Sequence, residues 1–125
     1  MDRHPNIHYC ILESGFGWLP FRGARMDDQS VSMSYALPKT LAHKPSEYMT
    51  SGRFFASVTI HEGEKLAGMV TDFPGDGVLL YSSDYPHAEC RFLESTDQVL
   101  AWRSAGDEAM RKMFWDYTTR CFGEP

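Results

Sequence analysis

Three short apolar runs constrain the fold of this chain more than any other feature of its sequence. They span residues 7–12, 54–60 and 78–81, and none alternates cleanly between apolar and polar side chains. Continuous apolar runs of this length are typical of strands that are buried on both faces, as in a parallel sheet covered by helices. Segments with helical periodicity separate the runs, so the pattern predicts an α/β fold built from βαβ units.

The helical segments follow the strands in order. Apolar residues recur at helical spacing over residues 66–73, and residues 107–123 carry the clearest apolar stripe, with Asp107 as a predicted N-cap and Gly123 at the C-terminal end. Ser95 opens a capping-box pattern, and a short helix is predicted over residues 46–51.

The segment between residues 18 and 38 has a poorer pattern. Leu19, Phe21 and Met26 could line one face of a helix, but Gly23 weakens that prediction.

Three parallel strands are too few to close a barrel, and the two outer ones would each leave an apolar edge unpaired. Side chains that would pack a barrel interior are expected to lack an opposite wall. We therefore expect the chain to be a piece of a larger protein, to form an oligomer, or to pair with a partner chain that supplies the remaining strands. The side chains concerned are Ile11, Phe55, Val58 and Leu80.

Composition narrows the class of protein. The 125 residues suffice for one domain, and 42% hydrophobic with 23% charged residues is an ordinary globular balance. A net charge of −5 without a basic cluster argues against nucleic-acid or membrane binding, and no apolar run could span a bilayer. Cys10, Cys90 and Cys121 are too widely spaced for a disulfide framework or a zinc ribbon, which favours a reducing compartment, the cytoplasm by default.

Two polar clusters follow predicted strands and are candidates for chemistry. Asp84 and His87 come directly after the third run, where side chains of parallel sheets face the ligand crevice. The alternative for this pair is a turn-capping Asp and a solvated His. Glu13 and Ser14 follow the first run in the same way, whereas Gly15 belongs more naturally to a simple turn.

The segments that contain these two clusters also resemble parts of a known protein family. Residues 3–20, with Glu13-Ser14-Gly15-Phe16-Gly17-Trp18-Leu19-Pro20, resemble the sixth-strand region of the amidohydrolase-related family of metal-dependent hydrolases and nonoxidative decarboxylases. Residues 44–48 resemble the segment before its seventh strand. Residues 81–87, Tyr-Ser-Ser-Asp-Tyr-Pro-His, resemble its eighth-strand motif, and residues 111–123 its closing helix.

The resemblance implies that residues 1–125 form strands six to eight of a TIM-like (β/α)₈ barrel. It implies one divalent metal, zinc or manganese, with Asp84 as metal ligand and partner in proton transfer, and a small carboxylic acid or amide as substrate. Glu13 stands where many members carry an acid/base histidine, and His87 is a possible further ligand. The family's first-strand histidine pair and fifth-strand histidine have no counterpart in this sequence, so Asp84 is the one ligand that the resemblance assigns. Because a catalytic zinc usually needs about three protein ligands, a non-catalytic barrel remnant or assembly subunit stays open as an alternative.

Other candidates carry weaker patterns. His4 and His8 are expected to be structural or solvated, and His61-Glu62 fails to complete a His-Glu-x-x-His motif because position 65 is Lys. Cys90, three residues after His87, is more simply a buried, inert thiol than a nucleophile.

Overall fold

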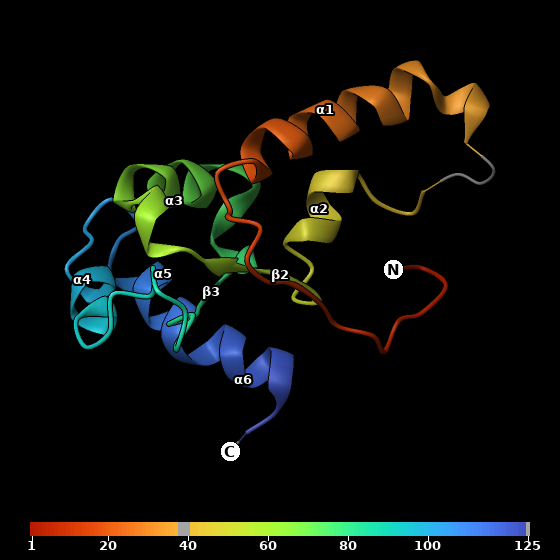
Figure 1. The fold of residues 1–125 in the computed structure, drawn as a ribbon. Helices are drawn as coiled ribbons and strands as arrows, with labels where there is room; N and C mark the ends of the chain where they lie inside the picture. The colour runs from red at the N-terminus through yellow and green to blue at the C-terminus, as the bar shows by residue number, and fades with distance from the viewer. Residues whose placement is uncertain (38–40, 125) are drawn as a thin grey trace.

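A three-stranded parallel sheet forms the centre of the protein, which we describe from a computed structural model covering residues 1–37 and 41–124 (Figure 1). The strands are β1 (Tyr9–Ile11), β2 (Phe54–Val58) and β3 (Leu79–Tyr81), and their order in the sheet is β1-β2-β3. All three lie inside the apolar runs of the sequence. The predicted α/β class with an open parallel sheet is therefore confirmed; the larger barrel implied by the resemblance stays a prediction.

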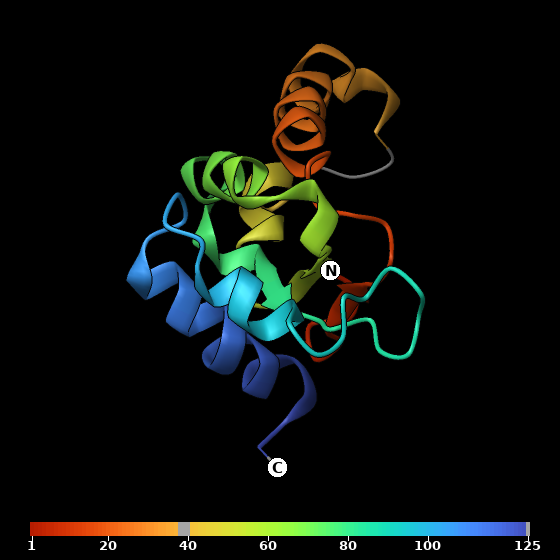
Figure 2. The same ribbon diagram turned by 60° about the vertical axis from the view of Figure 1, so that its left-hand side comes forward.

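Helices connect and cover the strands. The sides of the sheet differ: α1, α2 and α3 lie on one side and α6 on the other in both views (Figures 1 and 2). The α-helices are α1 (Leu19–Ser32), α2 (Pro45–Met49), α3 (Glu64–Val70), α4 (Ser95–Leu100), α5 (Asp107–Arg111) and α6 (Tyr117–Phe122). Shorter helical turns are η1 (Ser34–Ala36), η2 (Ile60–Glu62), η3 (Thr71–Gly75), η4 (Asp76–Val78) and η5 (Lys112–Asp116). None of the helices in residues 1–37 and 41–124 is long and apolar enough to cross a membrane.

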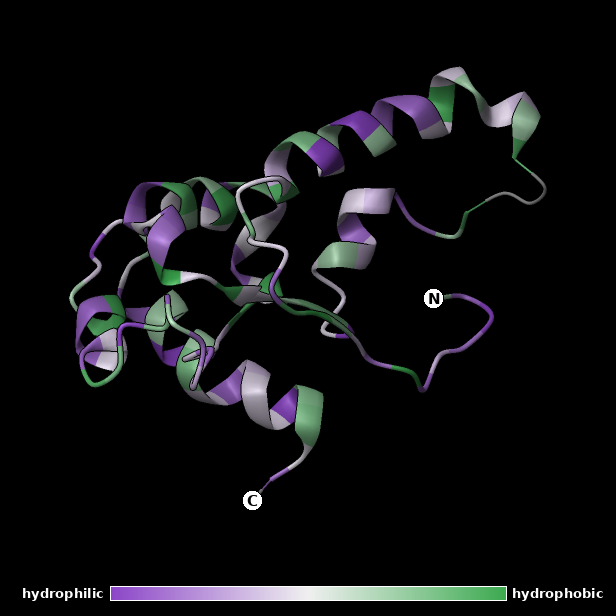
Figure 3. Ribbon diagram, in the orientation of Figure 1, coloured by the Kyte–Doolittle hydropathy of each residue, from purple (hydrophilic) through white to green (hydrophobic). Residues whose placement is uncertain are grey.

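Side chains alternate along β2 between two clusters of buried residues. Ala56 and Val58 belong to the larger cluster, which the connecting helices cover, whereas Phe55 belongs to a smaller cluster on the other face. Figure 3 shows these hydrophobic strands at the centre, with hydrophilic residues along much of α1. Strand β2 is thus buried on both faces, which explains why its sequence does not alternate.

The smaller cluster corrects one prediction. Phe55 and Leu80 were expected to lack an opposite wall, yet their exposed fractions are 0% and 2% because Tyr117 packs against them from α6. Val58 is also buried, within the larger cluster, and only Ile11 remains partly exposed. The prediction was wrong for three of the four side chains because the closing helix folds over that face of the sheet.

Helix α1 is longer and more regular than its sequence suggested, with 14 residues. Gly23 is buried, and a Cβ atom built there would lie 3.1 Å from the ring of Phe73. The glycine therefore allows a close approach between α1 and the turn after α3. Glycine in a helix costs about 1 kcal/mol in helix propensity, and here the packing of Gly23 against Phe73 outweighs that cost. The local sequence does not reveal this contact.

Two predicted helix caps are shifted by one residue. Ser95 is the first residue of α4, with Glu94 as the N-cap, and the Ser95 hydroxyl accepts a hydrogen bond from Tyr81 at 3.3 Å. Asp107 begins α5 and Gly106 is its N-cap. The predicted C-terminal Gly123 is confirmed, with φ of 92°.

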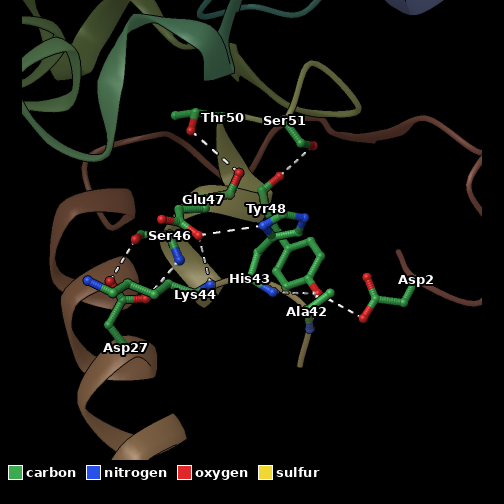
Figure 4. A network of polar contacts seen from close by, with 10 residues as sticks. All are labelled: Asp2, Asp27, Ala42, His43, Lys44, Ser46, Glu47, Tyr48, Thr50 and Ser51. Carbon is green, nitrogen blue, oxygen red and sulfur yellow. Dashed lines mark hydrogen bonds and ion pairs between the residues drawn. The ribbon is translucent and has the colours of Figure 1, made fainter. Parts of the chain in front are cut away.

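A polar network ties the short helix α2 to its surroundings (Figure 4). Asp27 of α1 accepts hydrogen bonds from the backbone N–H of Ser46 (2.8 Å) and from its hydroxyl (2.6 Å). On the other side, the Tyr48 hydroxyl donates to Asp2 at 2.8 Å. A helix of five residues is marginal alone, so these contacts hold α2 in place.

Candidate functional site

The loops after β1 and β3 leave the sheet at its carboxyl edge through residues in the left-handed conformation. Glu13 has φ of 58° and Asp84 has φ of 57°. Each residue is anchored by a nearby serine: the Glu13 N–H donates to the Ser57 hydroxyl, and the Asp84 N–H donates to the Ser82 hydroxyl, both at 3.4 Å. Non-glycine residues adopt this conformation rarely and cluster at functional sites.

Glu13, Asp84 and His87 converge at this edge, and we call them the strand-end triad. His87 Nδ1 lies 2.9 Å from Asp84 Oδ1 and 3.7 Å from Glu13 Oε1. One potential ligand atom from each residue lies within 4.8 Å of the others. The loop that carries Asp84 and His87 runs beside β1 (Figure 2). The prediction that the Glu13 and Asp84 carboxylates share one edge of the sheet is confirmed.

A tight turn sets the geometry of the triad. The His87 N–H donates to the Asp84 carbonyl at 2.9 Å, which folds the imidazole back onto the carboxylate of the same turn. Asp84 is the most enclosed member, with 27% of its side chain exposed, against 66% for Glu13 and 56% for His87. The triad therefore sits at the surface, open to a small ligand.

Two carboxylates and an imidazole can act as acid and base, or as ligands for a divalent cation. Oxygen and imidazole donors suit zinc or manganese, and three protein donors match the usual number at a catalytic zinc. Two of the three groups also contact each other directly, because Asp84 faces His87 at hydrogen-bond distance. The arrangement permits both interpretations, and the metal role of Asp84 stays a prediction.

A small cavity opens beside Asp84 at the carboxyl ends of β2 and β3. Its volume of about 20 Å³ is room for one water molecule. Its lining residues include His61, Ser83, Asp84, Glu89 and Cys90. Cys90 is buried, which agrees with its interpretation as an inert thiol.

Glu62 organises the loop after β1, a role that its rejected place in a His-Glu-x-x-His pattern did not indicate. Its carboxylate accepts the backbone N–H of Phe16 (2.5 Å) and of Gly17 (3.1 Å), and the hydroxyl of Thr59 (2.9 Å). A Cβ atom at Gly15 would lie 2.7 Å from that carboxylate, so glycine at this position lets the loop fold closely around the Glu62 side chain. The only local signal was the pair of glycines, which indicated a close backbone approach without indicating to what.

Two of the remaining histidines, His8 and His43, have contacts outside the triad. His8 Nδ1 is 3.3 Å from the backbone oxygen of Cys121, which fits a structural role. His43 is exposed and lies 3.8 Å from Glu47, one turn along the chain.

Comparison with known proteins adds no family to this picture. No protein-family model matches the chain, and none of the curated proteins matches it. The fold and the site together define an α/β protein with a three-stranded parallel sheet and a carboxylate–imidazole cluster at its carboxyl edge.

Proposed function

We propose that this chain is the C-terminal part of a metal-dependent (β/α)-barrel enzyme like those of the amidohydrolase-related family. Its substrate would be a small carboxylic acid or amide, which it would hydrolyse or decarboxylate. The observation that carries the proposal is the convergence of Glu13, Asp84 and His87 at the carboxyl edge of a parallel sheet. Parallel α/β enzymes place their chemistry at this edge.

Asp84 has the central role in this proposal because it is the least exposed of the three and contacts His87 directly. It would hold the metal and exchange a proton with the substrate, and Glu13 and His87 would complete the ligand set. The metal, when bound, would polarise a carbonyl or carboxylate or activate water.

His87 can also move a proton. When its Nδ1 carries hydrogen and donates to Asp84, Nε2 is left as the basic nitrogen of the ring. The Asp84 carboxylate then orients the imidazole.

The second candidate is a non-catalytic barrel subunit. The observation that favours it is the Asp84–His87 pair at 2.9 Å, in which the imidazole and the carboxylate already contact each other without a metal ion. In that case the strand-end triad would be a turn-stabilising cluster.

The two candidates differ in metal binding, which Asp84→Asn tests. The purified protein is titrated with Zn²⁺ and Mn²⁺ by isothermal titration calorimetry, and turnover is measured in the complete enzyme. We expect one bound metal per chain, and at least a 100-fold loss of affinity together with loss of metal-dependent turnover in Asp84→Asn. The fold should stay intact by circular dichroism.

Glu47→Gln is the matched control, because His43 and Glu47 form another exposed imidazole–carboxylate pair that is not at a strand end. This variant should bind metal as the wild type does. An Asp84→Asn protein with unchanged metal content and turnover would contradict the metal assignment, and absence of binding by the wild type would favour the non-catalytic subunit.

A further inference from the structure

Two cysteines from opposite ends of the sequence meet on one face of the sheet. Cys10 is the middle residue of β1, where it pairs in register with Phe55, and Cys121 lies in the last turn of α6. Both side chains pack against the same small cluster of buried residues: Phe55, Leu80 and Tyr117. The cluster therefore fixes the two thiols on a common surface.

An independent contact places the same two segments together. His8 Nδ1 lies 3.3 Å from the backbone oxygen of Cys121, and the His8 ring stands edge-on to Phe55 at 6.2 Å. In an extended chain, residues two apart point to the same side. His8 and Cys10 therefore both face the C-terminal turn of α6, one through its ring and the other through its thiol.

We infer that Cys10 and Cys121 form a reversible intramolecular disulfide bond when the protein meets a low-molecular-weight disulfide such as oxidised glutathione. The thiolate of one cysteine attacks a sulfur of the oxidant and forms a mixed disulfide, which releases the first small thiolate. The second cysteine attacks the protein sulfur of that mixed disulfide, which releases the second. Two protein thiols are oxidised, one disulfide is reduced, and two thiols of the oxidant leave with the two protons.

The surroundings of the thiols set the rate of these steps. Burial raises the pKa of Cys10 to about 11 and raises the pKa of Cys121 as well. Because little of either thiol is ionised at neutral pH, the disulfide forms slowly and only while an oxidant is present.

The bond would join the edge strand β1 to the C-terminal helix across the buried face of the sheet. It would close nearly the whole chain into one loop, and such long loops restrict the unfolded state most strongly. Oxidation would therefore hold α6 on the sheet.

The experiment compares the native protein in oxidised glutathione with the same protein in urea. Non-reducing mass spectrometry of proteolytic fragments identifies the bonded pairs. In the native protein we expect the Cys10–Cys121 bond with Cys90 left as a free thiol, and a rise in melting temperature on the order of 10 °C that dithiothreitol reverses. In urea, the shorter Cys90–Cys121 loop should dominate, because loop-closure entropy favours it.

Single variants separate the two steps. Cys10→Ser should trap glutathione on Cys121, Cys121→Ser should trap it on Cys10, and neither variant should gain stability on oxidation. Native oxidation that gives only glutathione adducts, or a bond that includes Cys90, would overturn the inference. The proposal is independent of metal binding, so its outcome does not bear on the enzymatic proposal.

Discussion

The Glu62 carboxylate lies inside the loop between β1 and α1 and accepts two backbone N–H groups and one hydroxyl. These contacts connect the end of β2 to the loop that begins with Glu13. A single side chain thereby sets the path of a segment that contributes to the strand-end triad.

Glu62→Gln should loosen this loop. An amide side chain keeps one acceptor oxygen but sets an NH₂ group against a backbone N–H, which leaves a donor without a partner at a cost of about 1–3 kcal/mol. Urea denaturation of the variant should show a loss of this size. Glu89→Gln, at an exposed residue, is the control and should change stability by less than about 0.5 kcal/mol. Equal stabilities for the two variants would show that Glu62 has no such role.

Cys10 gives the folded protein a dependence on alkaline pH. Its pKa is raised by burial from 9.0 to about 11, and the pKa values of Cys121 and Tyr117 are raised in the same direction. The unfolded thiol ionises first, so the Cys10 contribution to stability is fully present below pH 9 and is lost as pH rises towards 11. Reduced wild-type protein should lose more stability than Cys10→Ser between pH 8 and pH 10.5 in urea titrations. Parallel curves for the two proteins would contradict this assignment.

At the scale of elements, α1 is joined to α2 by one carboxylate. Asp27 accepts both the backbone N–H and the hydroxyl of Ser46 at the start of α2, in the manner of a helix cap supplied from another helix (Figure 4). The charge also lies near the N-terminal end of α2, where the helix dipole favours a negative group.

Asp27→Ala should therefore destabilise the protein by about 1–3 kcal/mol, because two donors of Ser46 lose a charged acceptor. The matched control is Asp28→Ala, on the same helix one residue further and exposed to solvent. That change should lie within about 0.5 kcal/mol of the wild type. Thermal melts of both variants measure the difference. A larger loss of stability in Asp28→Ala than in Asp27→Ala would contradict the role of Asp27 in joining the two helices.

At the scale of the whole molecule, the sheet keeps two outer strands. Among the described residues, β1 and β3 each pair with β2 alone. Leu12, directly after β1, is exposed, as are Phe92 and Leu93 in the loop after β3. Exposed strand edges with apolar neighbours favour pairing with another chain. We accordingly propose that the chain forms oligomers or binds a partner chain that extends the sheet.

Sedimentation velocity should show association that increases with protein concentration. Leu12→Lys places a charge beside β1 and should weaken this association, whereas Phe21→Lys on the exposed face of α1 should not. A compact monomer at all concentrations, with a cooperative melt, would contradict the need for a partner.

Local sequence patterns determined where the strands of this protein form and which of their ends lie together. The apolar runs predicted all three strands, and parallel strands imply that their carboxyl ends share an edge, so Glu13 and Asp84 could be predicted to lie together. Gly123 was predictable as a helix terminus because its role depends on backbone conformation within a few residues. These features depend on short stretches of chain, whose periodicity is visible without the fold.

The tertiary structure decided whatever depends on which distant segments meet. Gly23 weakens the helical pattern of α1, yet packing against Phe73 makes it the residue that fits. Glu62 is an ordinary acidic residue until the loop after β1 wraps around it. Cys10 and Cys121 show no pairing pattern in the sequence, and only the folding of α6 over the sheet brings them onto one cluster. Such contacts depend on long-range packing, which spacing along the chain does not encode.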